Sequence, residues 1–322
     1  MSILIFAEHQ NGKPNKTAKE LASYAKALAE KTGGEVIALG FGLTSPEDLY
    51  AYGVNKVLNV DDQRFTTFNA KAYAEAFKQA AAQNGIKIIL TGQTADGMYF
   101  TPLLAGMLKA AYVTQVISLP EQNDPFIIKR KAFSNKAIAH VALKTDIKIL
   151  NIAKNSFGLQ ENPVEGVTET FKPEVADEVF EEIKSVKVEK ATGKVPLSDA
   201  EIIVSAGRGL KGPENWGMIE ELAEVLGAAT ACSKPVADMG WRPHSEHVGQ
   251  TGKQVAPNLY IAIGISGAIQ HLAGVNSSKN ILVINIDPEA PFFKAADYGV
   301  VGDAFEVVPK LIEKLKEFKS AH

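Results

Sequence analysis

Three polar, glycine-rich segments in the second half of the chain have the residue types to bind an anionic ligand. They are Gly207–Gly209, Ser266–His271 and Asn285–Asp287, and each follows an apolar run that predicts a parallel strand. Open α/β sheets bind ligands at the carboxyl ends of their strands, so we expect these segments to line one crevice. Glycine lets the backbone approach a phosphate closely, and a helix that begins there points N–H groups at it. Because G-R-G lacks the third glycine of the dinucleotide fingerprint, this pattern alone leaves the ligand open.

Two side chains in these segments suit such a ligand. Arg208 can pair bidentately with a phosphate, and the alternative is a solvated loop arginine. His271 lies about one turn into a predicted helix, where it could donate to an anionic ring oxygen; a lone helical histidine is otherwise structural. Ser266 and Gly267 stand where this helix needs an N-cap, which is compatible with ligand binding.

Residues 241–253 form a long polar loop that contains His244, Glu246 and His247. Their order, H-S-E-H, lacks the H-E-x-x-H spacing of a helical zinc site, and a proline precedes it, so we expect no bound metal. The Gly249–Gly252 stretch, G-Q-T-G, is better interpreted as a ligand-contacting turn, with a plain surface loop as the alternative.

Other reactive or nucleotide-like features lack supporting neighbours. Cys232 has no visible base beside it, which favours a buried or bystander thiol, and Ser205 is not in a G-x-S-x-G elbow, so hydrolase chemistry lacks support. Thr91–Thr94, T-G-Q-T, follows a strand and opens a helix, but it has no P-loop lysine. It favours a structural turn or a partner surface.

The composition sets the class of protein that must position these residues. A chain of 322 residues with 46% hydrophobic content predicts about two folded domains. With a net charge of −3, we do not expect nucleic acid as a main partner. The sequence has no uninterrupted run of 18 apolar residues, so we expect no membrane span. One cysteine excludes an internal disulfide, and the N-terminus has no signal-peptide pattern. We therefore expect a reducing compartment, cytoplasmic or matrix-like, with the cytoplasm as the predicted localisation.

The first half of the chain alternates strand and helix patterns, which predicts βαβ units and a mostly parallel sheet. From about residue 113 to residue 153 a β-rich extension completes this domain, and residues 179–188 could add one more strand. The expected strands are Ile3–Phe6, Val36–Leu39, Lys56–Val60, Ile86–Leu90, Phe126–Lys129, Ala137–Leu143 and Ile147–Ile152.

A second α/β pattern begins at Glu201, after a Gly193–Pro196 string that is typical of a linker. We expect strands at Ile202–Ser205, Leu259–Ile265 and Ile281–Ile286, and a last helix opened by Pro309. The predicted organisation is therefore an N-terminal α/β domain over residues 1–192, a linker at 193–198 and a second doubly wound domain over 199–322.

The string LYIAIGISGAIQHLAG at Leu259–Gly274, followed by V-I-N at Val283–Asn285, closely resembles the signature of electron transfer flavoprotein α subunits. The resemblance covers the chain from about residue 202 to the C-terminus, while the first half is similar more loosely, in its opening strand and order of elements. Four further strings carry it: Gly207–Leu210, Val248–Lys253, Asp287–Pro291 and Ala296–Gly299.

This resemblance implies an α/β fold of two doubly wound domains. The N-terminal domain would be adenine-nucleotide-hydrolase-like and would form the subunit interface, and the C-terminal domain would be Rossmann-like, bind FAD and swivel. It also implies a heterodimer with a β subunit that carries AMP or a second FAD. Electrons would pass from dehydrogenases, typically the acyl-CoA dehydrogenases of fatty acid β-oxidation, to the membrane quinone oxidoreductase. The chain would then be an electron carrier and not an enzyme with a substrate of its own.

The family's FAD contacts carry over by resemblance. Arg208 is expected near the pyrophosphate or adenosine half, and Asn285 and Asp303 near the adenosine end. Thr251 is expected near flavin N5 and His271 near flavin O2, where it would stabilise negative charge on the one-electron-reduced ring. The full set is Arg208, Ser233, Lys234, Val248, Gly249, Gln250, Thr251, Ser266, Gly267, Ala268, Ile269, Gln270, His271, Asn285, Asp303 and Ala304.

One position departs from the family pattern. Related chains usually have S-R where this chain has Ser233-Lys234, so lysine keeps the positive charge but loses the planar guanidinium that stacks on a flavin ring. This change bears on the flavin potential and slightly favours a specialised, electron-bifurcating protein linked to NADH. A nucleotide-binding protein without a redox role is the alternative from another class.

Overall fold

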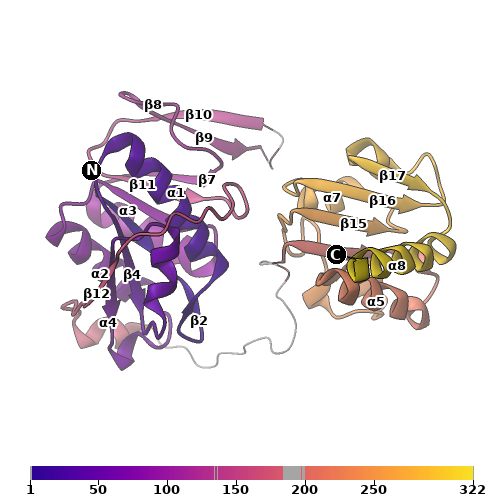
Figure 1. The fold of residues 1–322 in the computed structure, drawn as a ribbon, viewed down its shortest axis with the longest axis horizontal. Helices are drawn as coiled ribbons and strands as arrows, with labels where there is room; N and C mark the ends of the chain where they lie inside the picture. Colours follow the sequence, from indigo (N-terminus) through magenta and orange to yellow (C-terminus); the bar gives the residue numbers. More distant parts are fainter. Residues whose placement is uncertain (1, 134, 136, 184–196, 198–199, 322) are drawn as a thin grey trace. The chain divides into compact units, whose positions relative to one another are not determined.

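The chain folds into two compact units, Met1–Val188 and Glu189–His322, in the computed structural model (Figure 1). The structure describes residues 2–133, 135, 137–183, 197 and 200–321. The expected Gly193–Pro196 linker and the boundaries drawn around it lie outside the described residues.

A ten-stranded sheet is the centre of the first unit, in the order β10-β9-β7-β11-β6-β1-β4-β5-β12, with β8 paired to β9. Neighbours from β7 and β11 through β12 pair in parallel, while β8, β9 and β10 form an antiparallel edge. The expected parallel sheet with a β-rich extension is confirmed. Its strands are β1 (Ile3–Phe6), β4 (Val36–Phe41), β5 (Lys56–Val60), β6 (Ile88–Gly92), β7 (Ala111–Val116), β8 (Gln122–Asn123), β9 (Phe126–Ala132), β10 (Ala137–Leu143), β11 (Lys148–Ile152) and β12 (Val167–Thr170).

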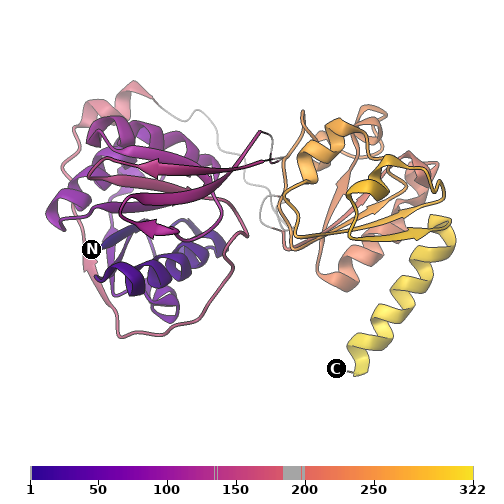
Figure 2. The same cartoon turned by 90° about the horizontal axis from the view of Figure 1, so that it is seen from above.

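Alternation along β1 explains why helices cover both faces of this sheet (Figure 2). Ile3 and Ile5 pack against α1, whereas Leu4 and Phe6 point to the opposite face and pack against α2 and α3. The helices of this unit are α1 (Lys16–Thr32), α2 (Ala70–Gln83), α3 (Ala95–Leu108) and α4 (Asp177–Glu182), with 3₁₀ turns η1 (Pro46–Tyr52) and η2 (Gln63–Phe65); a small hairpin joins β2 (His9–Gln10) to β3 (Lys13–Pro14).

The strand expected over residues 179–188 is wrong where the structure describes it. Residues 177–182 form α4, and its Asp177 and Glu178 are acidic residues in the first turn, which favours a helix. Val179 and Phe180 pack on the α2 side of the core, so their burial does not require a strand.

The second unit has a five-stranded, all-parallel sheet in the order β14-β13-β15-β16-β17. One face packs against α5 and α8, and the other packs against α7 and the loops around it. The strands are β13 (Ile202–Ala206), β14 (Ala229–Cys232), β15 (Leu259–Ile263), β16 (Asn280–Asn285) and β17 (Tyr298–Val301). The helices are α5 (Gly217–Leu226), α6 (Lys234–Asp238), α7 (Ile269–Val275) and α8 (Ala304–Ala321), with 3₁₀ turns η3 (Arg208–Leu210), η4 (Pro213–Trp216), η5 (His244–Glu246) and η6 (Pro291–Ala295).

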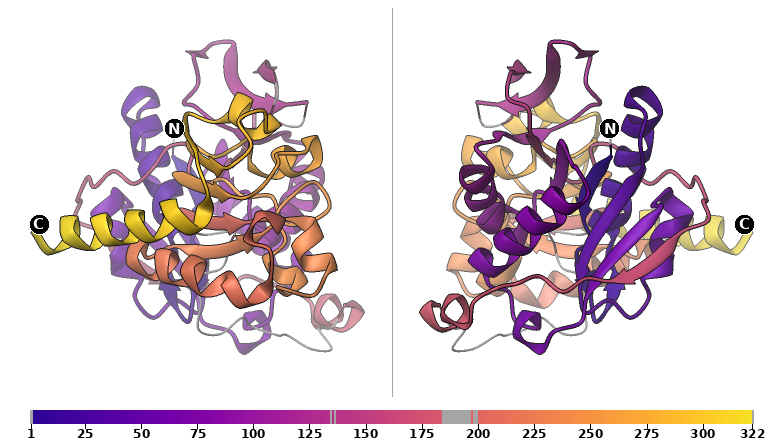
Figure 3. Two further views of the ribbon diagram at one scale, coloured as in Figure 1. Left: turned by 90° about the vertical axis from the view of Figure 1, so that its right-hand side faces the viewer. Right: turned by 90° about the vertical axis from the view of Figure 1, so that its left-hand side faces the viewer.

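The last helix begins earlier than expected. Asp303 accepts a hydrogen bond from the Phe305 backbone N–H at 2.9 Å, so α8 starts at Ala304 and Pro309 lies inside it. Figure 3 shows α8, in yellow, running beyond the sheet to the C-terminus. Over the residues that the structure describes, no helix combines the length and apolar character needed to cross a bilayer.

Candidate functional site

A cavity of about 560 Å³ lies at the carboxyl ends of β13, β14, β15 and β16, where a parallel sheet is expected to bind its ligand. This volume is within the range of small-molecule and cofactor sites, roughly 300–1,000 Å³. Most of the predicted site residues line it: Arg208, Ser233, Lys234, Val248, Gly249, Gln250, Thr251, Ser266, Ala268, Gln270, His271 and Asn285. The single crevice expected from the three segments is thus confirmed.

Four predicted site residues do not line the cavity. Gly267 has a φ of +83° and lies against Phe292, which a Cβ would approach to 2.4 Å, so its place is structural. Ile269 is exposed, and Asp303 caps α8. Ala304 is the first residue of α8, and its side chain is buried in the core between α8 and the sheet. Their role in binding remains a prediction.

Sequence reasoning missed several residues that line the cavity, including Pro235, Gly264, Ile265 and Ala290. Ile265 ended an expected strand, and Pro235 and Ala290 follow polar segments. None of the three has a side chain that suggests ligand binding, so their position in the loops that follow the strands was the one available signal. His247 also lines the cavity, although the sequence raised it only as a metal ligand.

Three glycines explain how the loops after β13 and β15 close on one another. The Gly209 N–H donates to the Gly264 carbonyl at 3.1 Å, and a Cβ at Gly207 would come within 2.3 Å of that oxygen. Gly264 itself has a φ of +60°, which favours glycine. The G-R-G glycines are therefore needed for loop packing, and this packing leaves Arg208 exposed at the cavity.

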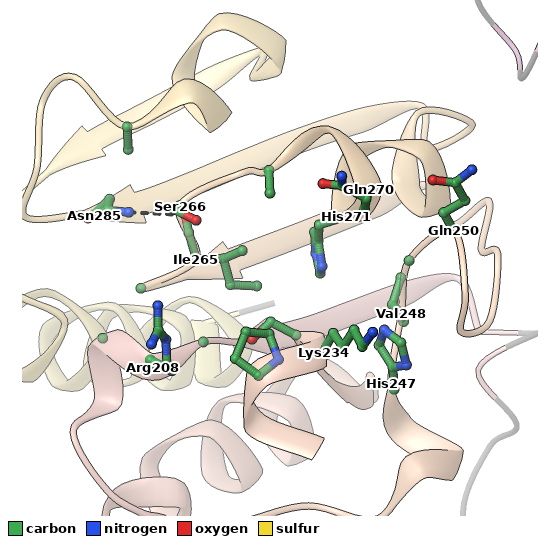
Figure 4. Close-up of a pocket in the computed structure, with 18 of the residues that line it drawn as sticks. Arg208, Lys234, His247, Val248, Gln250, Ile265, Ser266, Gln270, His271 and Asn285 are labelled. Carbon is green, nitrogen blue, oxygen red and sulfur yellow. Dashed lines mark hydrogen bonds between the residues drawn. The ribbon is translucent and has the colours of Figure 1, made fainter. Parts of the chain in front are cut away.

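Cationic and polar side chains face each other across the cavity (Figure 4). Arg208 and Lys234 lie on the side formed by the loops after β13 and β14, and Ser266, His271 and Asn285 lie on the opposite side. Arg208 and Lys234 are exposed, so both are accessible to an incoming anion.

Ser266 does not cap α7, contrary to the expectation. Ala268 occupies the N-cap position and makes no side-chain cap, while Ser266 is exposed on the cavity wall. The Ser266 carbonyl accepts the Phe292 N–H at 3.1 Å, which fixes the backbone and leaves the hydroxyl on the ligand side.

Asn285 holds the wall that carries Ser266. Its Nδ2 donates to the Ile265 carbonyl at 3.0 Å, and its Oδ1 accepts the Asp287 N–H at 3.1 Å (Figure 4). Both ends of the amide are therefore engaged, and the side chain ties the loop after β16 to the loop after β15. Asn285 shapes the cavity as well as lining it.

The predicted G-Q-T-G turn is anchored on two sides. The Val248 N–H donates to the Cys232 carbonyl at 3.0 Å, and the Gln250 N–H donates to the Gln270 carbonyl at 2.7 Å. A Cβ at Gly274 would meet the Gly249 Cα at 2.5 Å, so this turn lies directly on α7. These contacts hold Gln250 and Thr251 at the cavity.

His271 is buried, and its ring projects into the cavity (Figure 4). The Tyr260 hydroxyl lies 3.0 Å from His271 Nε2, whereas Nδ1 is buried without a hydrogen-bond partner. Burial, with a smaller contribution from His247, lowers the pKa of His271 to about 4, and the Val248 backbone opposes part of this shift. In the chain alone the imidazole is therefore neutral at pH 7, and it offers a neutral N–H rather than a charge.

The other candidate reactive groups are accounted for structurally. Burial raises the pKa of the Cys232 thiol to about 12, so the expected bystander thiol is confirmed. Glu246 is paired with Arg242 at 2.7 Å, and no group of three metal-binding side chains occurs among the residues described. In the first unit, Thr94 accepts the Gly97 N–H at 3.1 Å, which confirms a structural strand-to-helix turn.

Fold and site together define a class of protein: a two-unit, doubly wound α/β protein with a cation-bearing, cofactor-sized cavity in its second unit. Residues 3–182 match the family described as electron transfer flavoprotein domain, and residues 196–276 match the electron transfer flavoprotein FAD-binding domain. The chain belongs to the electron transfer flavoprotein α-subunit family.

Curated relatives agree over almost the full length. Electron transfer flavoprotein subunit alpha of Thermoanaerobacterium thermosaccharolyticum is 36% identical over 98% of both chains, and that of Bacillus subtilis is 35% identical over 98% of this chain and 97% of its own. Protein FixB of Clostridium saccharobutylicum is 34% identical over 99% and 97%. Among solved structures, the similarity to UDP-GlcNAc 2-epimerase of Methanocaldococcus jannaschii extends over 97% of this chain and 92% of that chain, at 11% identity and a TM-score of 0.36.

Proposed function

We infer that this chain is the α subunit of a heterodimeric electron carrier and that it binds one FAD in the cavity of its second unit. The observation that carries this proposal is the convergence of separate sequence segments on one cavity with two exposed cations and a buried, incompletely paired histidine. FAD has a negatively charged pyrophosphate and a ring with carbonyl oxygens, and the residues present fit both parts.

Each group has a defined task in this proposal. Arg208 and Lys234 attract and hold negative charge, and Lys234 takes the place of the usual arginine near the flavin ring. Gln250, Thr251 and Ser266 give hydrogen bonds from loops that are anchored to the sheet, and His271 donates to a ring oxygen. FAD supplies the electron-carrying chemistry when bound, and the chain binds it, orients it and limits its access to water.

This proposal assigns the chain no substrate turnover of its own. The Cys232 thiol, next in the chain to the cavity-lining Ser233, stays protonated at neutral pH, so it is not an activated nucleophile. Reduced thiols are typical of the cytoplasm, which we propose as its location. Electrons would arrive from dehydrogenases, typically acyl-CoA dehydrogenases, and leave to a quinone oxidoreductase.

The proposed partner is a β subunit that carries AMP or a second FAD. The relatives are named subunit alpha, which implies a second subunit. One face of α3 suits a partner protein, because its exposed positions contain no charged side chain and recur at helical spacing. These positions, which we name the α3 stripe, are Ala95, Met98, Tyr99, Pro102, Leu103 and Gly106.

A visible spectrum of the co-purified α and β chains tests the cofactor directly. We expect a bound flavin that bleaches on stepwise anaerobic reduction and returns on reoxidation by air. A colourless heterodimer that fails to take up added FAD would contradict the proposal and would favour a nucleotide-binding protein without a redox role.

An NADH-linked, bifurcating carrier is a second candidate, and Lys234 is the observation in its favour. Lysine at the cavity changes the charge distribution and stacking near the ring relative to arginine. Reduction of the purified heterodimer by NADH alone would support this candidate. Reduction only through an acyl-CoA dehydrogenase would support the simple carrier.

A further inference from the structure

Tyr260 reaches His271 from the strand beneath the cavity. Tyr260 lies in the middle of the sheet on β15 and is fully buried, and His271 comes from α7 above it. The hydroxyl oxygen is 3.0 Å from His271 Nε2, and the ring centroids are 6.1 Å apart. Phe292 packs near both rings, with centroids at 6.4 Å from Tyr260 and 5.7 Å from His271. The pair is therefore held in one arrangement.

The protonation states of the pair determine which atom donates. Burial raises the pKa of the Tyr260 phenol, and burial lowers that of His271, so a neutral phenol faces a neutral imidazole at pH 7. A neutral imidazole has one N–H donor and one nitrogen acceptor. An imidazole nitrogen is a better acceptor than a hydroxyl oxygen, so the Tyr260 O–H donates to Nε2 and the ring proton resides on Nδ1.

Ser205 is a neighbour of Tyr260 on the adjacent strand. In the β13–β15 register Ile203 pairs with Tyr260 and Ser205 pairs with Ala262, so Ser205 and Tyr260 face the same side of the sheet. The Ser205 hydroxyl is buried near Tyr260, and it lowers the pKa of the Tyr260 phenol, against the larger increase caused by burial. The Ser205 hydroxyl makes no hydrogen bond of normal distance and angle, so the hydrogen bond that holds the Tyr260 hydroxyl is the one to His271.

The remaining ring nitrogen, His271 Nδ1, is buried and makes no hydrogen bond of normal distance and angle. The Val248 backbone lies near enough to the ring to favour its protonated form, but it leaves Nδ1 unsatisfied. His271 also lines the cavity, so an acceptor atom of a bound ligand can satisfy this donor.

We propose that Tyr260 is a positioning residue: its hydroxyl holds His271 Nε2 and thereby fixes the tautomer that offers Nδ1–H to a carbonyl oxygen of the bound flavin ring. This inference rests on the proposed function for the identity of the ligand. The tautomer itself is a property of the chain without ligand.

The test uses Tyr260→Phe, which removes only the hydroxyl and keeps the packing against Phe292. Tyr24→Phe is the matched control, because Tyr24 is equally buried and its hydroxyl donates to the Ser118 carbonyl in the other unit. The first measurement is ¹⁵N NMR of histidine-labelled chain without ligand, with the His271 signals assigned through His271→Gln. We expect a protonated Nδ1 and an unprotonated Nε2 in the native chain and in Tyr24→Phe, and a gain of the Nε2-protonated form in Tyr260→Phe.

A native spectrum with protonated Nε2, or a Tyr260→Phe spectrum identical to the native one, would overturn the proposal. Even if Tyr260→Phe fails to fold, the native spectrum shows which nitrogen of His271 is protonated and therefore still tests the proposed tautomer. The second measurement is FAD affinity of the α–β heterodimer, in which Tyr260→Phe should bind about fivefold more weakly, the effect of one neutral hydrogen bond. If the native heterodimer binds no FAD, the proposed function fails while the NMR result still decides the role of Tyr260.

Discussion

The cavity distinguishes two kinds of residue, those that can meet a ligand directly and those that hold the first kind in place. Arg208 and Lys234 are exposed cations on one wall, whereas Asn285 has both ends of its amide engaged by backbone groups. Loss of either exposed cation should mainly change binding, because neither side chain makes a hydrogen bond or ion pair with another residue that the structure describes. Loss of Asn285 would alter the wall as well.

Arg208→Gln should weaken FAD binding by roughly tenfold or more, because it removes a charge-assisted contact to phosphate. Titration of the FAD-free heterodimer with FAD, followed by flavin fluorescence, measures this change. Lys310→Gln is the control, since Lys310 is an equally exposed cation on α8. Equal affinities of the two variants would show that Arg208 does not contact the cofactor.

Lys234→Arg should shift the flavin reduction potential if Lys234 occupies the position of the usual arginine. The guanidinium keeps the charge and adds a planar group that stacks on aromatic rings. Anaerobic redox titration of the heterodimer gives the potential. An unchanged potential would mean that the side chain at this position does not approach the ring.

At the scale of secondary structure, α3 is apolar on both of its sides. Phe100 and Leu104 are buried against the sheet, and the α3 stripe on the opposite side carries Met98, Tyr99 and Leu103 with 44–69% of each residue exposed. Exposed apolar groups at this spacing are typical of a helix that packs against another protein. We assign this face to the β subunit.

Leu103→Lys should reduce the yield of the co-purified β subunit, because a charge in the middle of the α3 stripe would be buried without a partner. Pull-down of a tagged β chain and size-exclusion chromatography measure the association. Phe318→Lys on α8 is the control, as Phe318 is an exposed apolar residue (61%) in the other unit. Undiminished association of Leu103→Lys would exclude the α3 stripe from the interface.

At the scale of the whole molecule, the buried neutral His271 links stability to pH. Its folded-state pKa is about 4, below the usual histidine value of 6.5, so the unfolded chain binds a proton first as pH falls. The contribution to stability is therefore complete above pH 6.5 and is lost progressively down to about pH 4. The shift corresponds to an upper bound of about 3 kcal/mol.

His271→Gln should flatten the pH dependence of stability in this window. Urea unfolding of the full chain without cofactor, at several pH values between 7 and 4, gives the free energy of unfolding of the second unit from a probe placed there. Native protein should lose stability more steeply than the variant below pH 6.5. Parallel curves would show that His271 is not the residue responsible.

Hydrophobic patterning was enough to predict several elements. Lys56–Val60 and Ala137–Leu143 form strands over the predicted residues, because β-branched and apolar side chains recur there. β14 was missed because its sequence, A-T-A-C, contains only small residues and is recognisable only by its burial beside β13. The segment of α4 was predicted to be a strand. A helix of six residues with only two core contacts, Val179 and Phe180, is too short to show a helical repeat of apolar residues in the sequence.

The sequence by itself determined the fold class, the family and the set of residues at the carboxyl ends of the strands. These depend on local patterns and on strings that lie together in the chain. Only the tertiary structure decided the hydrogen bonding and charge of His271, because they depend on Tyr260, His247 and burial contributed by separate strands and helices. It likewise decided that Asn285 ties two loops together, since hydrogen bonds between distant segments leave no periodic trace in a sequence.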